Sequence, residues 1–408
     1  MQEWWKKYGQ FITDEDKAIL TTVRDFTEKE IMPVRKELDE DRERVLFHRI
    51  MQGLARIGIQ KSPFPESMGG LGRRSAVTYA TIYEEVSRGD SAIAMVMGIP
   101  AWIFAPAIKA RNEVVLRELG APFCSDDYHA ACMGLTEPEG GCNVEALDAS
   151  IRRISTVARL EGDEWVINGT KRWPSEAGVA EVYSIVCTTD PEHQSDEGIA
   201  LIYVPAGTPG LSFGKPEDKM GMKYTDVNAD IYLDEVRVPR EYRAAGPGED
   251  AELVRHTLSW GRLLSAPQAL GNAQAVFEIV VDYTGNRFFG GKQVRQHSLH
   301  AGMIADMAIS IESARAFYLM VASMFDHRKL YGDHSADYLV SKASAAKVYA
   351  ADVTIDVCNT AIELMGSYGY SRDFHVEKYL RDSKIVQLWV GGAQAGRLDV
   401  ARGYYPMS

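Results

Sequence analysis

The sequence has few cysteines, and they are widely spaced. Five occur in 408 residues, at Cys124, Cys132, Cys142, Cys187 and Cys358, and no two of them form a CxxC pair. Because structural zinc sites and disulfide frameworks need paired or clustered cysteines, this spacing argues against both. Scattered free thiols are typical of a reduced compartment, so we expect a cytoplasmic protein without a bound metal.

Excess positive charge and long apolar runs are also missing. Lys and Arg total 45 against 57 Asp and Glu, which gives a formal net charge of -12. This balance argues against a nucleic-acid partner, although a few placed cations or backbone N–H groups can still hold a phosphate. The polar N-terminus, MQEWWKKYGQFITDED, does not resemble a signal peptide. We see no run of 18 apolar residues, so no membrane-spanning helix is expected.

The length suits two or three domains rather than one core, and the patterning divides the chain into three parts. The fold class we predict is α+β. It has an N-terminal α-helical domain at 1–127, a middle antiparallel β-barrel or sandwich domain at 128–245, and a C-terminal four-helix bundle at 246–408.

Local signals support each part. In the first, Thr13 is a candidate N-cap, and the apolar run over 76–108 predicts one buried helical stretch. In the second, alternating residues with turn signals at Gly162-Asp163 and Asn168-Gly169 predict strands. In the third, four long helical runs with short links are typical of a bundle, and the last of them covers 382–405.

Three motifs lie in order along the chain: MGLTEPEGG at 133–141, VINGTKRWPSEAG at 166–178 and LMGSYGYSRDFHVEKYLRDSKI at 364–385. Together with the domain order, they resemble the acyl-CoA dehydrogenase family over nearly the whole chain. The resemblance implies bound FAD, a homotetramer, and removal of a proton and a hydride from an acyl-CoA. It also implies an electron-transfer flavoprotein as the electron acceptor.

The resemblance assigns four residues to the flavin ring. Leu135 and Thr136 would offer donors to its pyrimidine edge, Trp173 would pack against it, and Ser175 would offer a hydroxyl toward N5. A flavin that takes a hydride at N5 needs such fixed donors. From residue type alone, Trp173 is a core aromatic, and the two hydroxyls are ordinary strand or turn groups.

Other positions would contact the rest of FAD. Gly366 and Gly369 would let the backbone approach the pyrophosphate, with a helix C-cap as the alternative. Gln394 would reach the ribityl or adenosine part. Arg287 would contact the FAD of a neighbouring subunit, with a solvated turn as the alternative. Cys142 stands where the family commonly has a serine near a diphosphate, and a small buried thiol is equally compatible.

The catalytic glutamate of the family is missing. The family pattern Tyr-Glu-Gly-Thr is replaced here by Trp389-Val390-Gly391-Gly392, and the alternative position, just before Arg262, is Gly261. We call Val390 and Gly261 the two glutamate positions. Val390 and Gly391 would then line the substrate site, with Arg262 near the CoA unless it forms a structural salt bridge. Neither glutamate position can accept a proton, which excludes ordinary α,β-desaturation through them.

Three explanations compete: a non-catalytic subunit, flavin oxygen chemistry, or removal of a proton from a different carbon. The third fits an acyl group that already carries a ring double bond, because its acidic hydrogen lies at C3 and a hydride can leave from C6. The departure resembles the cyclohex-1-ene-1-carboxyl-CoA dehydrogenase type, which forms cyclohexa-1,5-diene-1-carboxyl-CoA by 1,4-elimination. A conventional dehydrogenase with a displaced base stays open.

Asp90 is the predicted base for this reaction. It interrupts an apolar helical run whose family counterpart lines the acyl pocket. A buried acid there would have a raised pKa unless it is paired, as a base requires. The alternatives for Asp90 are a helix N-cap for the run that begins at Ser91, or a salt bridge to Arg88.

Overall fold

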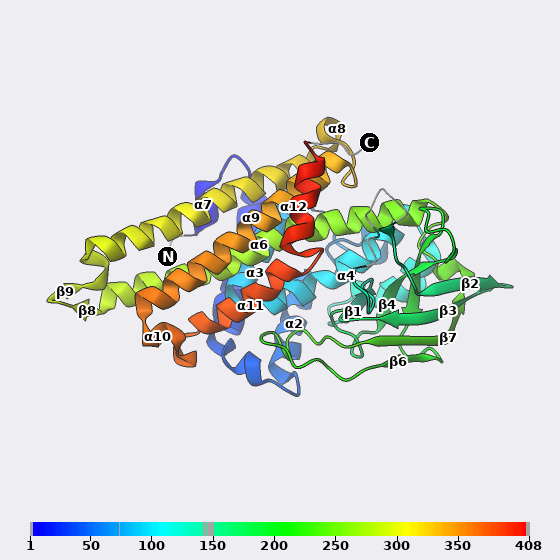
Figure 1. The fold of residues 1–408 in the computed structure, drawn as a ribbon, viewed down its shortest axis with the longest axis horizontal. Coiled ribbons are helices and arrows are strands. Elements are labelled where there is room, and N and C mark those ends of the chain that lie inside the picture. The colour runs from blue at the N-terminus through cyan, green and yellow to red at the C-terminus, as the bar shows by residue number, and fades with distance from the viewer. Residues whose placement is uncertain (1–2, 73, 142–143, 145–150, 405–408) are drawn as a thin grey trace.

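The computed structural model describes residues 3–72, 74–141, 144 and 151–404 (Figure 1). Helices at both ends of the chain pack together, and a sheet lies at one end of this helical body. The predicted order of helical, sheet-rich and helical parts is confirmed. The element type changes between Cys124 and Ala131, and again between Tyr242 and Glu249.

The N-terminal part is built from four longer helices: α1 (Asp14–Phe26), α2 (Val45–Ile57), α3 (Ala76–Gly89) and α4 (Ser91–Ala110). Thr13 caps α1, because its hydroxyl accepts from the Asp16 N–H while the Asp16 carboxylate accepts from the Thr13 N–H. Shorter helical segments are Trp4–Lys7, Thr27–Ile31, Met32–Val34, Glu37–Glu40, Glu66–Met68, Glu113–Val115, Leu116–Gly120 and Ala121–Cys124.

The apolar run over 76–108 is two helices rather than one. Asp90 has extended backbone angles (φ -156°, ψ 127°), which ends α3 and starts α4. The expectation that no segment is apolar and long enough to cross a membrane was also wrong. By length and composition alone, α4 and α7 (Ser298–Asp326) both qualify within the described residues. Most of α4 is buried between α3 and α6, as in a core helix.

The middle part forms a seven-stranded sheet with strand order β1-β4-β2-β3-β7-β6, and β5 pairs with β4. The strands are β1 (Ala131–Gly134), β2 (Val157–Glu161), β3 (Glu164–Lys171), β4 (Val182–Thr188), β5 (Ile199–Pro205), β6 (Leu211–Phe213) and β7 (Ile231–Pro239). The prediction of a purely antiparallel domain was wrong, because β4 pairs in parallel with both β1 and β2.

One of the two predicted turns is confirmed. Gly162 and Asp163 connect β2 to β3 in an antiparallel hairpin. Asn168-Gly169 is instead inside β3, where the pairing with β7 shifts register. Gly169 has φ +151°, and a Cβ there would lie 2.7 Å from the Thr156 Cα. Close approach of two strands therefore explains this glycine.

The C-terminal part contains α6 (Glu249–Asn286), α7, α9 (Asp337–Met365), α11 (Val376–Leu388) and α12 (Gly392–Arg402). The fourth predicted run is thus divided, because Val390, Gly391 and Gly392 all have positive φ. The smaller elements are Arg240–Tyr242, β8 (Phe288–Phe289), β9 (Lys292–Gln293), Val294–Gln296, α8 (Arg328–Tyr331), α10 (Ser367–Tyr370) and Arg372–Phe374.

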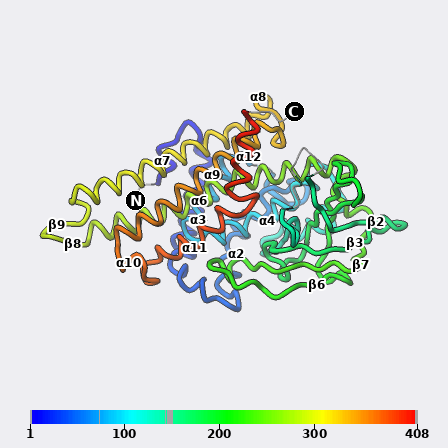
Figure 2. Tube along the Cα trace, in the orientation of Figure 1, coloured from blue at the N-terminus to red at the C-terminus, as the bar shows by residue number. Residues whose placement is uncertain are grey.

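The 38-residue α6 organises the site, because it contacts α3, α4, α9 and α11. It extends from the sheet end of the molecule to the β8–β9 hairpin at the opposite end (Figure 2). Helix α4 runs antiparallel to it. Trp102 Nε1 donates to the Thr257 carbonyl at 2.6 Å, and Gln268 Nε2 donates to the Ser91 carbonyl at 2.6 Å.

Candidate active site

The ends of β1 and β3 bring the predicted flavin residues together. The Arg172 N–H donates to the Thr136 carbonyl at 2.8 Å, so the TEP segment and the Trp173 turn are adjacent. The Trp173 side chain is 40% exposed and Thr136 is exposed, while Leu135 and Ser175 are partly buried. The core-aromatic alternative for Trp173 is therefore wrong.

Glu137 anchors the loop that carries Thr136. Its carboxylate is buried and pairs with Lys171 Nζ at 2.7 Å, and it accepts from the N–H groups of Ser155 (2.7 Å) and Thr156 (2.9 Å). Burial by itself would raise the pKa of Glu137, but Lys171 and the Ser155 hydrogen bonds lower it to about 2. The sequence motif pointed to Leu135 and Thr136 but not to Glu137, because the partners of Glu137 come from β3 and the segment before β2.

Glu137→Gln is expected to reduce stability in a pH-dependent way. The pKa of Glu137 falls from its ordinary 4.5 to about 2 on folding, so its ionised form stabilises the native state above about pH 4.5. That contribution, on the order of 3 kcal/mol, is lost as the pH falls toward 2. Denaturant unfolding at pH 7, 5, 4 and 3 should show that the difference in unfolding free energy between wild type and Glu137→Gln becomes smaller at low pH. A difference that is the same at every pH would contradict this role.

A buried ion pair holds the turn that carries Trp173 and Ser175. Arg44 NH2 donates to both Glu176 oxygens, at 2.8 and 2.7 Å, and the Val227 N–H donates to Oε1 at 3.3 Å. Burial raises the pKa of Glu176 to about 7, although Arg44 opposes this shift. Trp173 and Glu176 both have positive φ, which is uncommon outside glycine. The N-terminal part therefore fixes a strained turn of the sheet domain.

The donors at this face fit a flavin. The Thr136 hydroxyl makes no hydrogen bond to any described residue. Ser175 Oγ only accepts, at 3.5 Å from Asn228 Nδ2, which leaves its own proton to donate. Asn228 Nδ2 also donates to the Trp173 carbonyl at 2.8 Å and so steadies the exposed indole. An aromatic face beside two hydroxyl donors matches the needs of an isoalloxazine ring.

A second group of predicted FAD residues lies elsewhere. Arg287 follows α6, with its guanidinium carbon 5.6 Å from the centre of the Tyr368 ring. Both residues line a cleft of about 610 Å³. Gly366 ends α9 with φ +60°, which confirms the C-cap alternative, and nothing lies within 4 Å of a Cβ built there. A Cβ at Gly369 would lie 2.7 Å from the Ile362 Cα, so packing requires this glycine.

The two groups are carried by separate regions of a single chain. Helix α10 and the β8–β9 hairpin are at one end of the molecule, and β1 and β3 are toward the other (Figure 1). Gln394 is exposed on the first turn of α12. Cys142 lies outside the described residues. One chain therefore does not gather all the predicted FAD contacts around one ligand.

Neither glutamate position carries an acid, and the structure shows what occupies each. Val390 is partly buried with φ +47°, a strained value for a β-branched residue. Lys347 Nζ donates to the carbonyls of Trp389 and Val390 and holds this segment. A Cβ at Gly261 would lie only 2.1 Å from Cζ2 of Trp102, so an indole covers the second position.

Arg262 is buried directly under the Val390–Gly391 segment. Its NH2 lies 3.2 Å from Asp399 Oδ2 and 3.6 Å from a Cβ built on Gly391. The Ser344 hydroxyl donates to the same Asp399 oxygen at 3.1 Å. The structural salt bridge considered for Arg262 is therefore present, beside the predicted substrate-binding residues.

Asp90 has the geometry of its structural alternatives rather than that of a base. Its side chain is 1% exposed, and Oδ1 accepts from the N–H groups of Ala92 (2.9 Å) and Ile93 (3.1 Å). Its Oδ2 pairs with Lys378 Nζ at 2.8 Å, not with Arg88. Asp90 lies beside the Gln268 end of α4, about 18 Å along the helix from Trp102. This geometry favours the helix-cap alternative for Asp90 and argues against a role as the base.

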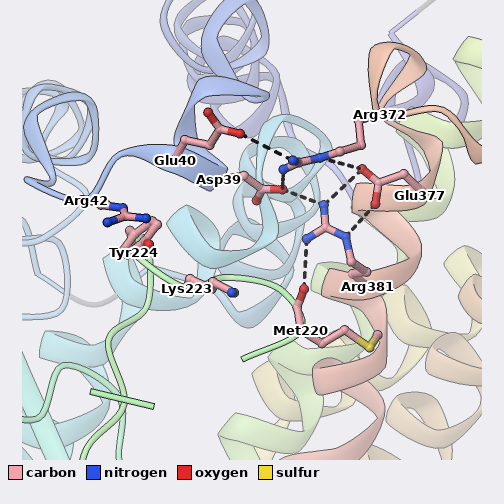
Figure 3. A pocket seen from close by; sticks show the side chains of 9 residues that line it. All are labelled: Asp39, Glu40, Arg42, Met220, Lys223, Tyr224, Arg372, Glu377 and Arg381. Atoms are coloured by element: carbon pink, nitrogen blue, oxygen red, sulfur yellow. Dashed lines mark hydrogen bonds and ion pairs between the residues drawn. The ribbon is translucent and has the colours of Figure 1, made fainter. Parts of the chain in front are cut away.

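The partner of Asp90 belongs to a larger ion network between the three parts of the chain. Lys378 also approaches Asp382 and Asp39, the latter at 3.6 Å. Asp39 in turn binds Arg381 at 2.6 Å and lies 3.9 Å from Arg372 (Figure 3). The Arg381 side chain also donates to the Met220 carbonyl at 3.0 Å, at the rim of a polar cleft of about 680 Å³. This network joins the parts and explains the Arg-Asp pair of the third motif.

Three family models match the chain in order. They are the acyl-CoA dehydrogenase N-terminal domain at residues 13–112, the middle domain at 132–236 and the C-terminal domain at 251–405. Among solved structures, butyryl-CoA dehydrogenase from Megasphaera elsdenii is 28% identical, with a TM-score of 0.85. The match covers 97% of this chain and 99% of that one.

Curated relatives extend over almost the same length. Human short-chain specific acyl-CoA dehydrogenase is 31% identical over 96% of this chain and 90% of its own. Cyclohex-1-ene-1-carbonyl-CoA dehydrogenase from Geobacter metallireducens is also 31% identical, over 96% of this chain and 98% of its own. Members of this family are FAD-binding flavoproteins that dehydrogenate acyl-CoA thioesters, and the donors around Trp173 fit that cofactor. The chain therefore belongs to the acyl-CoA dehydrogenase family and is an oxidoreductase.

Proposed function

We propose that the protein dehydrogenates a cyclic enoyl-CoA of the cyclohex-1-ene-1-carbonyl-CoA class, forming the cyclohexa-1,5-diene thioester. Overall, the substrate loses a proton from C3 of the ring, which passes to solvent, and a hydride from C6, so the double bonds end in conjugation with the carbonyl. FAD, when bound, supplies the hydride acceptor. The relative from Geobacter metallireducens supports this substrate class.

The identity of the residues at the two glutamate positions is the main observation that supports the proposal. Both positions lack a carboxylate, and the indole of Trp102 fills the space beside Gly261. Removal of an α-proton from a saturated acyl chain therefore has no acceptor at either position. A substrate whose α-carbon is already sp² has no α-proton, so its reaction needs no base at residue 390.

Retention of the flavin-facing donors supports an enzyme rather than a non-catalytic subunit. Thr136, Trp173 and Ser175 are arranged around one face, and two buried ion pairs, Lys171–Glu137 and Arg44–Glu176, hold their backbone. The segment near the substrate is flanked by flat aromatic groups, because Trp389 donates to Ser265 Oγ at 2.9 Å and Trp102 lies against Gly261. Flat walls suit a six-membered ring better than a long flexible chain.

Anaerobic titration of the FAD-loaded protein tests the proposal. Cyclohex-1-ene-1-carbonyl-CoA should bleach the flavin absorbance, whereas butyryl-CoA and octanoyl-CoA should not. Bleaching by the saturated thioesters would indicate a conventional dehydrogenase with a displaced base. No bleaching by any thioester, together with oxygen consumption in air, would indicate flavin oxygen chemistry instead.

We also propose that the working form is a homotetramer in the cytoplasm that passes electrons to an electron-transfer flavoprotein. An assembly is supported by the place of Arg287, because its cleft is lined by residues of the helical parts and includes none of the residues around Trp173. Mass measurement in solution of the FAD-loaded protein should give four chains. A monomer that retains FAD would contradict this assembly.

A further inference from the structure

Tyr83 on α3 rests against a glycine of α4. A Cβ built on Gly98 would lie 1.3 Å from the Tyr83 hydroxyl oxygen and 2.5 Å from Cζ, so any larger residue would displace the phenol. The Tyr83 side chain is nevertheless partly exposed, although Ile82, Glu84 and Gly98 around it are buried. Part of the Tyr83 side chain therefore stays accessible at the contact between α3 and α4.

The contact between Tyr83 and Gly98 lies on the face of α4 that leads to the candidate active site. Met95, Gly98 and Trp102 are spaced by three and four residues and share one face of α4. Trp102 closes this face against Gly261, which is one of the two glutamate positions. The Tyr83 hydroxyl thus lies one helical turn from Trp102, about 6 Å farther from Gly261 along α4.

Helix α6 supplies the remaining wall. Tyr79 packs edge-on against Trp260 at 6.2 Å, and a Cβ at Gly271 would lie 2.5 Å from the Glu84 carbonyl. Helix α3 therefore runs beside α6, with Tyr83 at the level of Leu264. Leu264, Met95 and Trp102 are partly exposed apolar side chains packed on the core, as expected for the lining of an internal apolar pocket.

The Tyr83 hydroxyl is a polar group among these apolar side chains. Among the described residues it has no hydrogen-bond partner, and it is not fully enclosed. Burial raises the pKa of Tyr83, so the phenol stays protonated and can donate. Buried tyrosine hydroxyls usually find a partner, because an unpaired hydroxyl in an apolar site is costly.

We propose that the Tyr83 hydroxyl is the hydrogen-bonding group at the inner end of the acyl pocket, and we call it the polar floor. It selects CoA thioesters whose acyl group carries a hydrogen-bonding oxygen at the end remote from the thioester. The inference rests on the proposed CoA-thioester function and narrows its substrate class. An unsubstituted ring would leave the hydroxyl unpaired, whereas an oxygen on the ring carbon opposite the carbonyl would pair with it. A site built to bind such an oxygen discriminates strongly against the analogue without it.

Binding to protein whose flavin has been chemically reduced tests the inference without turnover. Equilibrium dialysis should give wild type a roughly 10- to 100-fold preference for 4-hydroxycyclohex-1-ene-1-carbonyl-CoA over the unsubstituted ring. Tyr83→Phe should abolish this preference by weakening only the hydroxylated ligand. Tyr79→Phe is the matched control, because that hydroxyl lies one turn earlier and pairs with Ser62 Oγ at 2.9 Å. It should leave the preference intact.

Equal binding of the two thioesters by wild type would overturn the inference, as expected if water satisfies the hydroxyl. A preference that survives in Tyr83→Phe, or is lost equally in Tyr79→Phe, would also overturn it. The pair 4-hydroxybutyryl-CoA and butyryl-CoA separates this result from the proposed ring substrate. A Tyr83-dependent preference within this linear pair supports the polar floor even if no cyclic thioester bleaches the flavin.

Discussion

Replacing Val390 by glutamate is expected to give the protein a new activity, the α,β-desaturation of saturated acyl-CoA. Residue 390 follows Trp389 in the segment that Lys347 holds above Arg262. A carboxylate there would stand at the position that the resemblance assigns to the family's base, and a positioned general base contributes on the order of 10²- to 10⁴-fold in rate. Anaerobic reduction of the flavin by butyryl-CoA, followed by stopped-flow absorbance, measures the gain.

The conformation of Val390 favours this substitution. A β-branched side chain at φ +47° costs about 1 to 3 kcal/mol, and an unbranched glutamate reduces that cost. Val390→Gln is the matched control, because it has nearly the same shape and relieves the same strain without a base. If Val390→Gln and Val390→Glu react equally with butyryl-CoA, the rate gain does not come from proton abstraction at this position.

Lys378→Met is expected to destabilise the protein strongly. It removes the cation that pairs with Asp90 at 2.8 Å and with Asp382, two carboxylates that are both 1% exposed. Removing one partner of a buried ion pair costs about 3 to 5 kcal/mol, because the remaining charge is uncompensated. Urea unfolding of the FAD-loaded protein measures the loss, and Lys378→Arg, which keeps the charge, should recover most of it.

The loss in Lys378→Met should grow as the pH rises. Burial, with repulsion from Asp90 and Asp39, already raises the pKa of Asp382 to about 6 in spite of Lys378. Without Lys378 that pKa rises further, so the folded state binds more protons than the unfolded state and stability falls with increasing pH. The variant should be closer to wild type at pH 5 than at pH 8. A deficit that is constant with pH would argue against uncompensated carboxylates as its cause.

Asp90→Asn separates a structural role from the catalytic one first considered. Asparagine keeps the cap on α4 and leaves Lys378 with Asp382 and Asp39, so we expect a modest loss of about 1 to 2 kcal/mol. Turnover per FAD-loaded protein should stay within a few-fold of wild type. A fall of 10²-fold or more would restore Asp90 as the base.

The sequence was sufficient for the parts of the fold that depend on local patterns. The N-cap at Thr13, the hairpin at Gly162 and three of the four long bundle helices follow from caps, turns and periodicity, and these are present. Local sequence patterns did not reveal which segments distant in the chain pack against one another. The Asn168-Gly169 pair has the residues of a turn, but contact with Thr156 across the sheet places it inside β3.

Asp90 shows the same limit at the site. A carboxylate among apolar residues predicts a perturbed base only if nothing pairs with it, and its partner Lys378 lies 288 positions away in the sequence. Trp102 and Tyr83 were missed for the opposite reason. Their only sequence signal is a small residue at Gly261 and at Gly98, which becomes informative once the facing helix is known.

The contact between Arg44 and Glu176 joins residues 132 positions apart, and it crosses from the start of α2 to the cofactor-facing turn. Misfolding of the N-terminal helical part should therefore reduce flavin binding, seen as a loss of the yellow flavin colour, as well as the solubility of the protein. During synthesis, the sheet emerges after Arg44 has left the ribosome, so the guanidinium is available when the Trp173 turn forms. Loading of the prosthetic group is in this way tied to correct assembly of the N-terminal helical part.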